Sequence, residues 1–277
     1  MSAADYAYPP ILQLESTTAC NLKCKFCPRE TLCSSDEYIE YEAFKHIVDA
    51  SKCRYLTLHG WGEPLMHKDL PSMAKYASVE KGMSVNFTTN ATLLDKYNGE
   101  LLDSGLDAIA FSMPTLENFT PLIEINIRNF IAWKKNSEKS PSLKTYINIA
   151  LMPENFDTLP EMISLAKDTG VDFVNFERSF PWDKKMHEIE KPLISLIKKT
   201  SRDIGCEVKL PILHTTPCCL FKNTMFVRTN GDVAPCCYRT DVKLGNVLSD
   251  SPLTIIKSRA MFSKKMSRDS ICKNCMV

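Results

Sequence analysis

The chain has 277 residues, and its 34 lysines and arginines nearly balance its 33 aspartates and glutamates. This balance excludes the strongly basic surface that attracts nucleic acids and anionic membranes, so we expect neither partner. No apolar run reaches the roughly 20 residues that span a bilayer, and no signal peptide is recognisable. We therefore expect a cytoplasmic protein whose 12 cysteines are reduced and include metal ligands.

Short apolar strands alternate with helical patterns along most of the chain. Strands are predicted at 11–14, 55–58, 84–88, 108–112, 146–151 and 173–176. Helices are predicted at 41–50, 70–80, 93–104, 122–135 and 159–169. This alternation is typical of an α/β fold on a parallel sheet, in which functional groups gather at the carboxyl ends of the strands.

Three cysteines, Cys20, Cys24 and Cys27, follow the first strand in the run CNLKCKFC. One loop can wrap three such thiolates around a [4Fe-4S] cube, which leaves the fourth iron open. A zinc knuckle or unrelated buried thiols are the alternatives, although zinc sites usually present paired Cys-x2-Cys or Cys/His ligands. The spacing, with Phe26 before the third cysteine, resembles the signature of the radical S-adenosylmethionine (SAM) enzymes.

The resemblance implies a fold, a cofactor and a reaction. The fold is a partial (β/α)6 TIM barrel, and the cofactor is a [4Fe-4S] cluster on Cys20, Cys24 and Cys27 that binds SAM, with Phe26 nearby. The reaction is reductive cleavage of SAM to a 5′-deoxyadenosyl radical, which abstracts a hydrogen atom from the substrate. A flavodoxin- or ferredoxin-type protein is the implied electron donor.

A second motif, HGWGEPL at 59–65, follows the second strand. It resembles the Gly-Gly-Glu-Pro segment of the same family, with Trp61 at a position where glycine is common. The resemblance implies that Gly62 and Glu63 contact the SAM amino group, and glycine lets a backbone approach a ligand closely. Taken alone, Gly-x-Gly-Glu is an ordinary turn, but its place one β/α unit after the cysteines favours cofactor binding.

Polar residues near later strands are further candidates for SAM binding. By resemblance, Thr88, Asn90 and Ser112 face the SAM ribose and carboxylate, and Arg128 forms a bidentate pair with the carboxylate. A turn or a solvated cap is the alternative role for the first three. For Arg128 the alternative is a position on the water-facing side of an amphipathic helix.

A second group of cysteines lies near the C-terminus, where Cys218 and Cys236 flank an Asn-Gly hairpin signal and Cys272 and Cys275 follow. This pattern resembles the SPASM domain and its shorter relative, the Twitch domain. It implies a C-terminal auxiliary domain with one [4Fe-4S] cluster on these four thiolates, and hence two clusters in all. We place the barrel at 1–205 and the auxiliary domain at 206–277.

Two alternatives remain open for this second group. Cys219 and Cys237 are the alternative ligands, because each neighbours a preferred cysteine. A structural zinc ribbon also suits four thiolates that include a Cys-x2-Cys pair.

The expected substrate is a small polar molecule such as a sugar or aminocyclitol, which the enzyme oxidises or epimerises. Single-auxiliary-cluster members of the family resemble 2-deoxy-scyllo-inosamine dehydrogenase, and a fully ligated cluster can accept the electron of a substrate radical. Only ten residues precede the first strand, so we expect no leader-binding module. The alternatives are a peptide-modifying maturase and, from another class, a non-catalytic iron–sulfur carrier, against which Gly62 and Glu63 argue.

Candidate catalytic residues follow the later strands. Glu177, Arg178 and Asp183 are candidates for a base that removes a hydroxyl proton, with surface charges or core caps as the alternatives. Cys206 is a candidate hydrogen donor to a substrate radical, and an ordinary buried thiol is its alternative.

Overall fold

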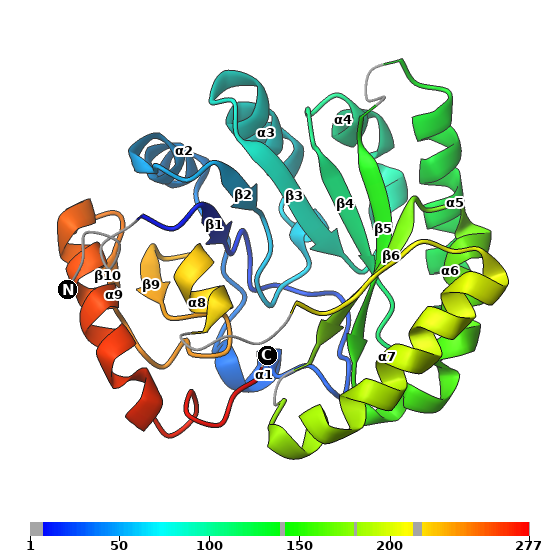
Figure 1. Ribbon diagram of the computed structural model, residues 1–277. Helices are drawn as coiled ribbons and strands as arrows, with labels where there is room; N and C mark the ends of the chain where they lie inside the picture. Colours follow the sequence, from blue (N-terminus) through cyan, green and yellow to red (C-terminus); the bar gives the residue numbers. More distant parts are fainter. Residues whose placement is uncertain (1–7, 139–141, 180–181, 213–217, 277) are drawn as a thin grey trace. The chain divides into compact units, whose positions relative to one another are not determined.

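The computed structural model describes residues 8–138, 142–179, 182–212 and 218–276 (Figure 1). The chain divides into two compact units, and each is described here by itself. The first unit comprises Met1–Phe87, Asp103–Leu106 and Thr215–Asp269, and the second comprises Thr88–Leu102, Asp107–His214 and Ser270–Val277. Parallel strands that alternate with helices confirm the predicted α/β class.

The first unit contains a mixed sheet. Its strands are β1 (Ile11–Leu14), β2 (Tyr55–Thr57), the first part of β3 (Ser84–Thr89), β8 (Thr224–Val227), β9 (Asp232–Ala234) and β10 (Gly245–Asn246). β1 pairs in parallel with β2 and with β8, and β2 pairs in parallel with β3, whereas β9 is antiparallel to both β8 and β10. The C-terminal segment therefore joins the sheet directly beside the first strand of the chain.

Helices of the first unit, except the short first one, bury apolar residues. They are α1 (Arg29–Leu32), α2 (Tyr41–Ala50), α3 (Leu70–Lys75), α8 (Cys219–Asn223) and α9 (Pro252–Lys265), with short turns η2 (Pro64–Met66), η3 (Tyr76–Glu80) and η6 (Met266–Arg268). α2 buries Phe44, Ile47 and Val48, whose spacing places them on one helix face. The helix predicted at 70–80 is α3 continued by the π-helical turn η3.

The second unit contains an all-parallel set of strands. They are β4 (Ala108–Ser112), β5 (Lys144–Leu151), β6 (Phe173–Arg178) and β7 (Val208–Lys209), paired in that order. Alternate residues of β5, namely Thr145, Ile147 and Leu151 among others, are fully buried, whereas Tyr146 and Asn148 are partly exposed. One face of these strands thus packs into the core, and the other is open to polar chemistry.

Helices of the second unit follow its strands. They are α4 (Asn98–Leu102), α5 (Pro121–Lys135), α6 (Leu159–Thr169) and α7 (Lys184–Ile204), with short turns η4 (Leu94–Lys96) and η5 (Pro153–Thr158). α6 packs against α5, β6 and α7. The helix predicted at 93–104 is shorter than expected, because it is split into η4 and α4.

α7 and β7 lie beyond the six predicted strand and helix units. Pro192 lies inside α7, and proline in a helical pattern argues against a continuous helix. The ends of α7 do carry ordinary signals, because Asp183 caps its first turn and Gly205 ends it at φ +69°. These two signals would have supported a helix despite the proline.

Candidate cofactor and substrate site

The loop after β1 carries the first group of cysteines. Its backbone is held where Cys27 N donates to Cys24 O at 3.0 Å and where Thr18 N donates to Glu37 O at 3.0 Å. All three thiols are partly exposed. Burial raises the pKa of Cys20, Cys24 and Cys27, and the charges of Cys27 and Cys20 raise the pKa of Cys24 further. Such mutual effects require the thiols to be neighbours.

Soft thiolates close together on one loop fit an iron–sulfur cluster. In the described part of the chain, no three His, Cys, Asp or Glu side chains are already arranged to hold a metal ion.

The segment of Gly62 and Glu63 lies directly against this loop. Glu63 N donates to Ala19 O at 2.7 Å, and a Cβ on Gly62 would lie 2.3 Å from Thr17 O and 2.6 Å from Ala19 O. Glu63 is 3% exposed, and its Oε1 accepts from Leu65 N at 3.0 Å. Its charge is one of the causes that raise the pKa of Cys20. A buried carboxylate thus lies beside the first thiol, where it suits a cationic amino group.

The polar residues at the ends of β3 and β4 belong to the second unit. Asn90 Oδ1 accepts from Thr92 N at 3.0 Å, so its side chain closes a turn. Thr88 is partly exposed within β3. Ser112 ends β4 opposite Asn148 of β5 in the strand register. Ser112 is therefore adjacent to the polar row described next.

Three polar side chains form a row on β5 and β6. Asn148 pairs in register with Asn175, and Asn175 Nδ2 donates to Asn148 Oδ1 at 2.8 Å. Both amides also donate to the Glu177 carboxylate, Asn175 at 3.1 Å and Asn148 at 3.3 Å. The three side chains therefore form one closed hydrogen-bonded group, called here the carboxamide row.

The carboxylate of the carboxamide row is the chemically distinctive group. Glu177 is exposed to solvent, yet the surrounding protein removes enough water from it to raise its pKa, while the amides of Asn148 and Asn175 oppose that rise. Burial, together with the charge of Glu177, raises the pKa of Tyr146 to about 12. A carboxylate in this state can exchange a proton with a ligand hydroxyl group.

The other three catalytic candidates are Arg178, Asp183 and Cys206, and their contacts or positions suit structural roles. Arg178 is 6% exposed, and its Nη2 lies 2.7 Å from Glu190 Oε1. Asp183 accepts from Met186 N at 2.9 Å as the N-cap of α7. Cys206 precedes β7, at the amino end of these parallel strands, whereas Glu177 lies at the carboxyl end of β6. The placements favour Glu177 as the proton acceptor.

Arg128 lies on the outer side of α5. Its Nη2 is 2.7 Å from Glu124 Oε1, and its Nη1 donates to Asp168 O. The guanidinium is 44% exposed. Its described contacts are thus a surface ion pair within α5 and a hydrogen bond to a backbone carbonyl of α6.

Asn175 was missed by the sequence reasoning, which named Glu177 as a candidate base. The signal was present, because Asn175 and Glu177 alternate with the buried Phe176 along β6. Period-two alternation places both polar side chains on the face opposite Phe176.

The C-terminal cysteines are divided between the two units. In the first unit, Cys218 caps α8, Cys219 begins it, and Cys236 and Cys237 follow β9. Cys272 belongs to the second unit, where its carbonyl accepts from Cys275 N at 3.3 Å. All four predicted ligands are partly exposed.

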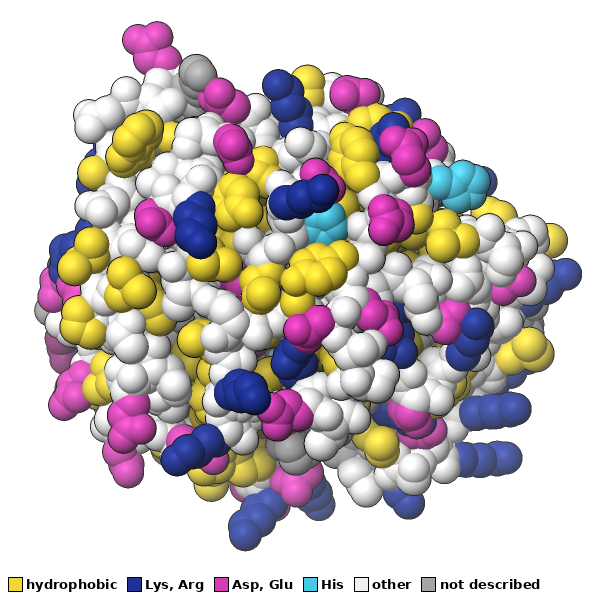
Figure 2. Space-filling model, turned by 180° about the vertical axis from the view of Figure 1, so that it is seen from behind, with side chains coloured by type: hydrophobic (Ala, Val, Ile, Leu, Met, Phe, Trp, Pro, Cys, Tyr) yellow, Lys and Arg dark blue, Asp and Glu magenta, His cyan; other side chains and the backbone are white. Residues whose placement is uncertain are grey.

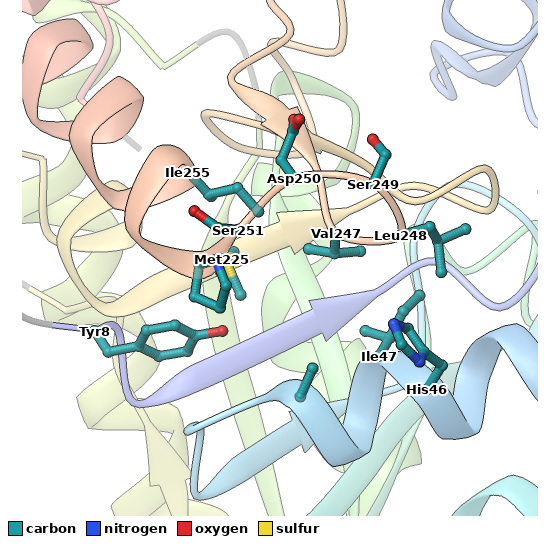
Figure 3. Close-up of a pocket in the computed structure, with 12 residues that line it drawn as sticks. Tyr8, His46, Ile47, Met225, Val247, Leu248, Ser249, Asp250, Ser251 and Ile255 are labelled. Atoms are coloured by element: carbon teal, nitrogen blue, oxygen red, sulfur yellow. The ribbon is translucent and has the colours of Figure 1, made fainter.

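The first unit also contains a cavity of about 320 Å³. Tyr8, His46 and Ile47 approach it from one side, and the segment from Val247 to Ser251, which leads into α9, approaches it from the other (Figure 3). Its lining includes none of the residues predicted to bind SAM or a cluster. Asp250 is already engaged, because its Oδ2 accepts from Asn246 N at 2.7 Å.

Charges of both signs are intermingled on the face shown in Figure 2, as the balanced composition predicts. Within the described ranges, every helix is too short or too polar to cross a bilayer.

Two sequence profiles match the chain. The profile of the radical SAM superfamily matches residues 14–166, and that of the SPASM iron–sulfur cluster-binding domain matches residues 218–276. Among curated proteins, the tungsten-containing aldehyde ferredoxin oxidoreductase cofactor-modifying protein of Pyrococcus furiosus is 26% identical over 253 residues, covering 81% of this chain and 70% of that protein. GTP 3′,8-cyclase of Chlorobaculum tepidum is 29% identical over 182 residues, covering 62% of this chain and 54% of the cyclase.

Solved structures share the fold at low identity. Streptococcus suis SuiB bound to SAM has a TM-score of 0.72 at 17% identity, covering 97% of this chain and 69% of SuiB. BtrN in complex with SAM and 2-DOIA has a TM-score of 0.56 at 14% identity, covering 97% of this chain and 93% of BtrN. At these identities the likeness extends to the fold alone.

Proposed function

The chain belongs to the radical SAM superfamily, and from that premise we propose that it is an oxidoreductase that dehydrogenates a hydroxyl-bearing small molecule, such as a sugar or aminocyclitol. Membership confirms the predicted partial barrel, the [4Fe-4S] cluster and SAM, and the SPASM match adds an auxiliary iron–sulfur cluster. The substrate class and the net oxidation are the proposal.

When bound, SAM and the first cluster would supply the radical chemistry that removes a hydrogen atom from the substrate, and an auxiliary cluster would supply a one-electron acceptor. Oxidation of a carbinol to a ketone also releases one proton. A protein group must therefore accept that proton.

Residues of the first unit are proposed to hold the first cluster and SAM. Cys20, Cys24 and Cys27 provide the three thiolates, and Phe26 lies between the last two. The buried carboxylate of Glu63 is proposed to bind the SAM amino group, and Gly62 keeps the segment close to the loop. Thr88, Asn90 and Ser112 remain proposed SAM contacts from the second unit.

The auxiliary cluster is proposed to lie on Cys218, Cys236, Cys272 and Cys275. The predicted boundary between 205 and 206 stays part of this proposal. A flavodoxin- or ferredoxin-type protein is the proposed electron donor.

The carboxamide row carries the proposal of a hydroxyl-bearing substrate. Glu177 is solvent-exposed, held by two amides, and has a raised pKa. Its carboxylate is proposed to accept the hydroxyl proton, while Asn148 and Asn175 orient it. BtrN, which shares the fold, was solved with SAM and 2-DOIA, so a small-molecule complex is compatible with this architecture.

The deciding experiment uses anaerobically reconstituted protein, dithionite, SAM and a panel of deuterated polyols and aminocyclitols. We expect about eight irons per chain, transfer of deuterium from substrate carbon into 5′-deoxyadenosine, and a ketone product. Incorporation of solvent hydrogen at that carbon without ketone would instead identify an epimerase.

Peptide modification is tested in the same assay. SuiB, which shares the fold, was also solved with the precursor peptide SuiA. A chain that cleaves SAM productively only when a peptide is added would be a maturase. Absence of 5′-deoxyadenosine with several reductants would favour the non-catalytic carrier.

A further inference from the structure

Trp61 makes a long-range contact within the first unit. Its Nε1 donates to Cys237 O at 2.8 Å, although the two residues are 176 positions apart. Its ring also packs edge-on against Tyr238, with centroids 5.3 Å apart. The indole therefore rests on the short segment that follows β9.

The backbone of the same residue is held from a second direction. Trp61 N donates to Glu15 Oε1 at 3.0 Å, and Glu15 is 1% exposed. Glu15 Oε2 lies 4.0 Å from Arg228 Nε, and neither of these two atoms has a hydrogen-bond partner among the described residues. Arg228 opens the β8–β9 hairpin, because its N donates to Asp232 O at 2.9 Å.

Gly60 allows this second arrangement. A Cβ at Gly60 would lie 2.4 Å from Glu15 Oε1, so a larger residue would push the carboxylate away from Trp61 N. Trp61 is thus connected to two parts of the β8–β9 hairpin. Glu15 links its backbone to Arg228 at the turn, and its indole bonds directly to Cys237 after β9.

Proposed ligands lie within two residues of each partner of this contact. Trp61 is followed by Gly62 and Glu63, which are proposed to bind SAM, and Cys237 follows Cys236, a proposed auxiliary-cluster ligand. If loading of the auxiliary cluster moves Cys237 O, the hydrogen bond passes that movement to the indole. The backbone of Trp61 then passes it to Gly62 and Glu63.

We propose that Trp61 is a positioning residue that couples the SAM segment to the auxiliary-cluster loop, so that assembly of the auxiliary cluster tightens SAM binding. The inference rests on the proposed ligand roles of Glu63 and Cys236. By linkage, SAM stabilises the loaded auxiliary site by the same factor. One hydrogen bond between partly buried groups corresponds to a coupling of about fivefold.

The test compares SAM affinity with and without the auxiliary cluster. Trp61→Phe removes the indole donor but keeps a ring against Tyr238. Trp133→Phe is the matched control, because Trp133 is 58% exposed on α5 in the other unit. Each of these proteins and the wild type is combined with Cys272→Ala/Cys275→Ala, and iron content verifies that one cluster is lost. Dissociation constants are measured by anaerobic equilibrium dialysis with labelled SAM.

We expect loss of the auxiliary cluster to weaken SAM binding about fivefold in wild type and in Trp133→Phe, and to leave it unchanged in Trp61→Phe. An equal effect of cluster loss in Trp61→Phe and wild type overturns the coupling. Wild type that binds SAM without any dependence on the auxiliary cluster overturns the coupling but leaves the proposed function intact. Wild type that binds no SAM overturns the proposed function and the coupling with it.

A second measurement covers the case in which the double cysteine variant does not fold. In proteins with all cysteines intact, saturating SAM is added before equilibration with an iron chelator, and the retained auxiliary-cluster signal is followed by electron paramagnetic resonance. SAM should protect this signal in wild type and Trp133→Phe but not in Trp61→Phe. Equal protection in all three contradicts the coupling.

Discussion

The segment of Gly62 and Glu63 follows β2, whereas the carboxamide row lies on β5 and β6, and the two regions are built differently. The first depends on backbone: Glu63 N donates to Ala19 O, and Gly62 lies so close to Thr17 O that no side chain fits. The second consists of side chains on regular strands, joined by their own hydrogen bonds.

This difference determines how each region should respond to substitution. The segment of Gly62 and Glu63 is held by close backbone packing, so one added methyl group should displace it. A region built from side chains on regular strands depends on chemical identity, so an isosteric change keeps the fold and alters the chemistry. The predictions below test this contrast, from the largest expected effect to the smallest.

The largest effect is expected from Cys24→Ala in the loop beside Gly62. Removal of one of three proposed thiolate ligands should abolish formation of 5′-deoxyadenosine, while about four irons remain on the auxiliary site. Cys33→Ala is the control, since Cys33 lies on the same stretch but outside the motif. Retained SAM cleavage in Cys24→Ala would show that this thiol is not a ligand.

Gly62→Ala tests the dependence on shape. Its Cβ would meet Thr17 O at 2.3 Å, so the segment must move away from the cysteine loop. We expect SAM affinity to fall at least about tenfold and the free energy of unfolding to fall by about 1–3 kcal/mol. Equilibrium dialysis and urea unfolding measure the two effects.

Gly99→Ala is the matched control for that substitution, because a Cβ at Gly99 meets no atom within 4 Å. In helix α4 it should leave SAM affinity unchanged and raise the free energy of unfolding by at most about 1 kcal/mol. Similar losses in both variants would mean that the close packing of Gly62 is not responsible.

Glu177→Gln tests the dependence on chemical identity. The amide keeps the shape but accepts no proton, so kcat should fall about 10²- to 10⁴-fold with SAM affinity preserved. Because the pKa of Glu177 is raised above the ordinary value of a glutamate, the ionised base is present above that raised pKa, and wild-type kcat should decline as pH falls through it.

The decline of kcat at low pH should be absent in Glu177→Gln, and initial rates measured across the pH range test this. Glu154→Gln, at an exposed position in η5, is the control and should keep the wild-type profile. If Glu177→Gln kept full activity, the carboxamide row would take no part in the reaction.

The smallest effect is expected from Arg128→Ala. Its exposed ion pair with Glu124 should contribute at most about 1 kcal/mol to the free energy of unfolding. SAM affinity should change by less than about twofold, since these surface contacts account for the guanidinium. Equilibrium dialysis measures the affinity for SAM. A tenfold loss would support a contact between Arg128 and the SAM carboxylate.

Much of the fold was predictable because its signals are local. Apolar runs bounded by turn residues located all six predicted strands, with ends displaced by one or two residues. α7 was missed because Pro192 interrupts its pattern, and the helix predicted at 93–104 broke into η4 and α4. The Asn-Gly signal predicted the hairpin that β8 and β9 form, but the pairing of β8 with β1 was missed, since it joins residues more than two hundred positions apart.

The sequence by itself determined the groups whose chemistry depends on spacing along the chain. Cys20, Cys24 and Cys27 lie on one loop, so short-range geometry alone brings their thiols near one another, and the resemblance read from that run agrees with the family match over residues 14–166. Polar residues at strand ends were likewise visible, because side chains alternate along a strand.

Only the tertiary structure decided which of those polar groups meet. Glu177 is joined by two amides, whereas the adjacent Arg178 points to the other face and is buried against Glu190. Trp61 reaches Cys237 across 176 residues. Such contacts depend on strand register and on how distant segments pack, and no local pattern in the chain encodes which distant partner will be there.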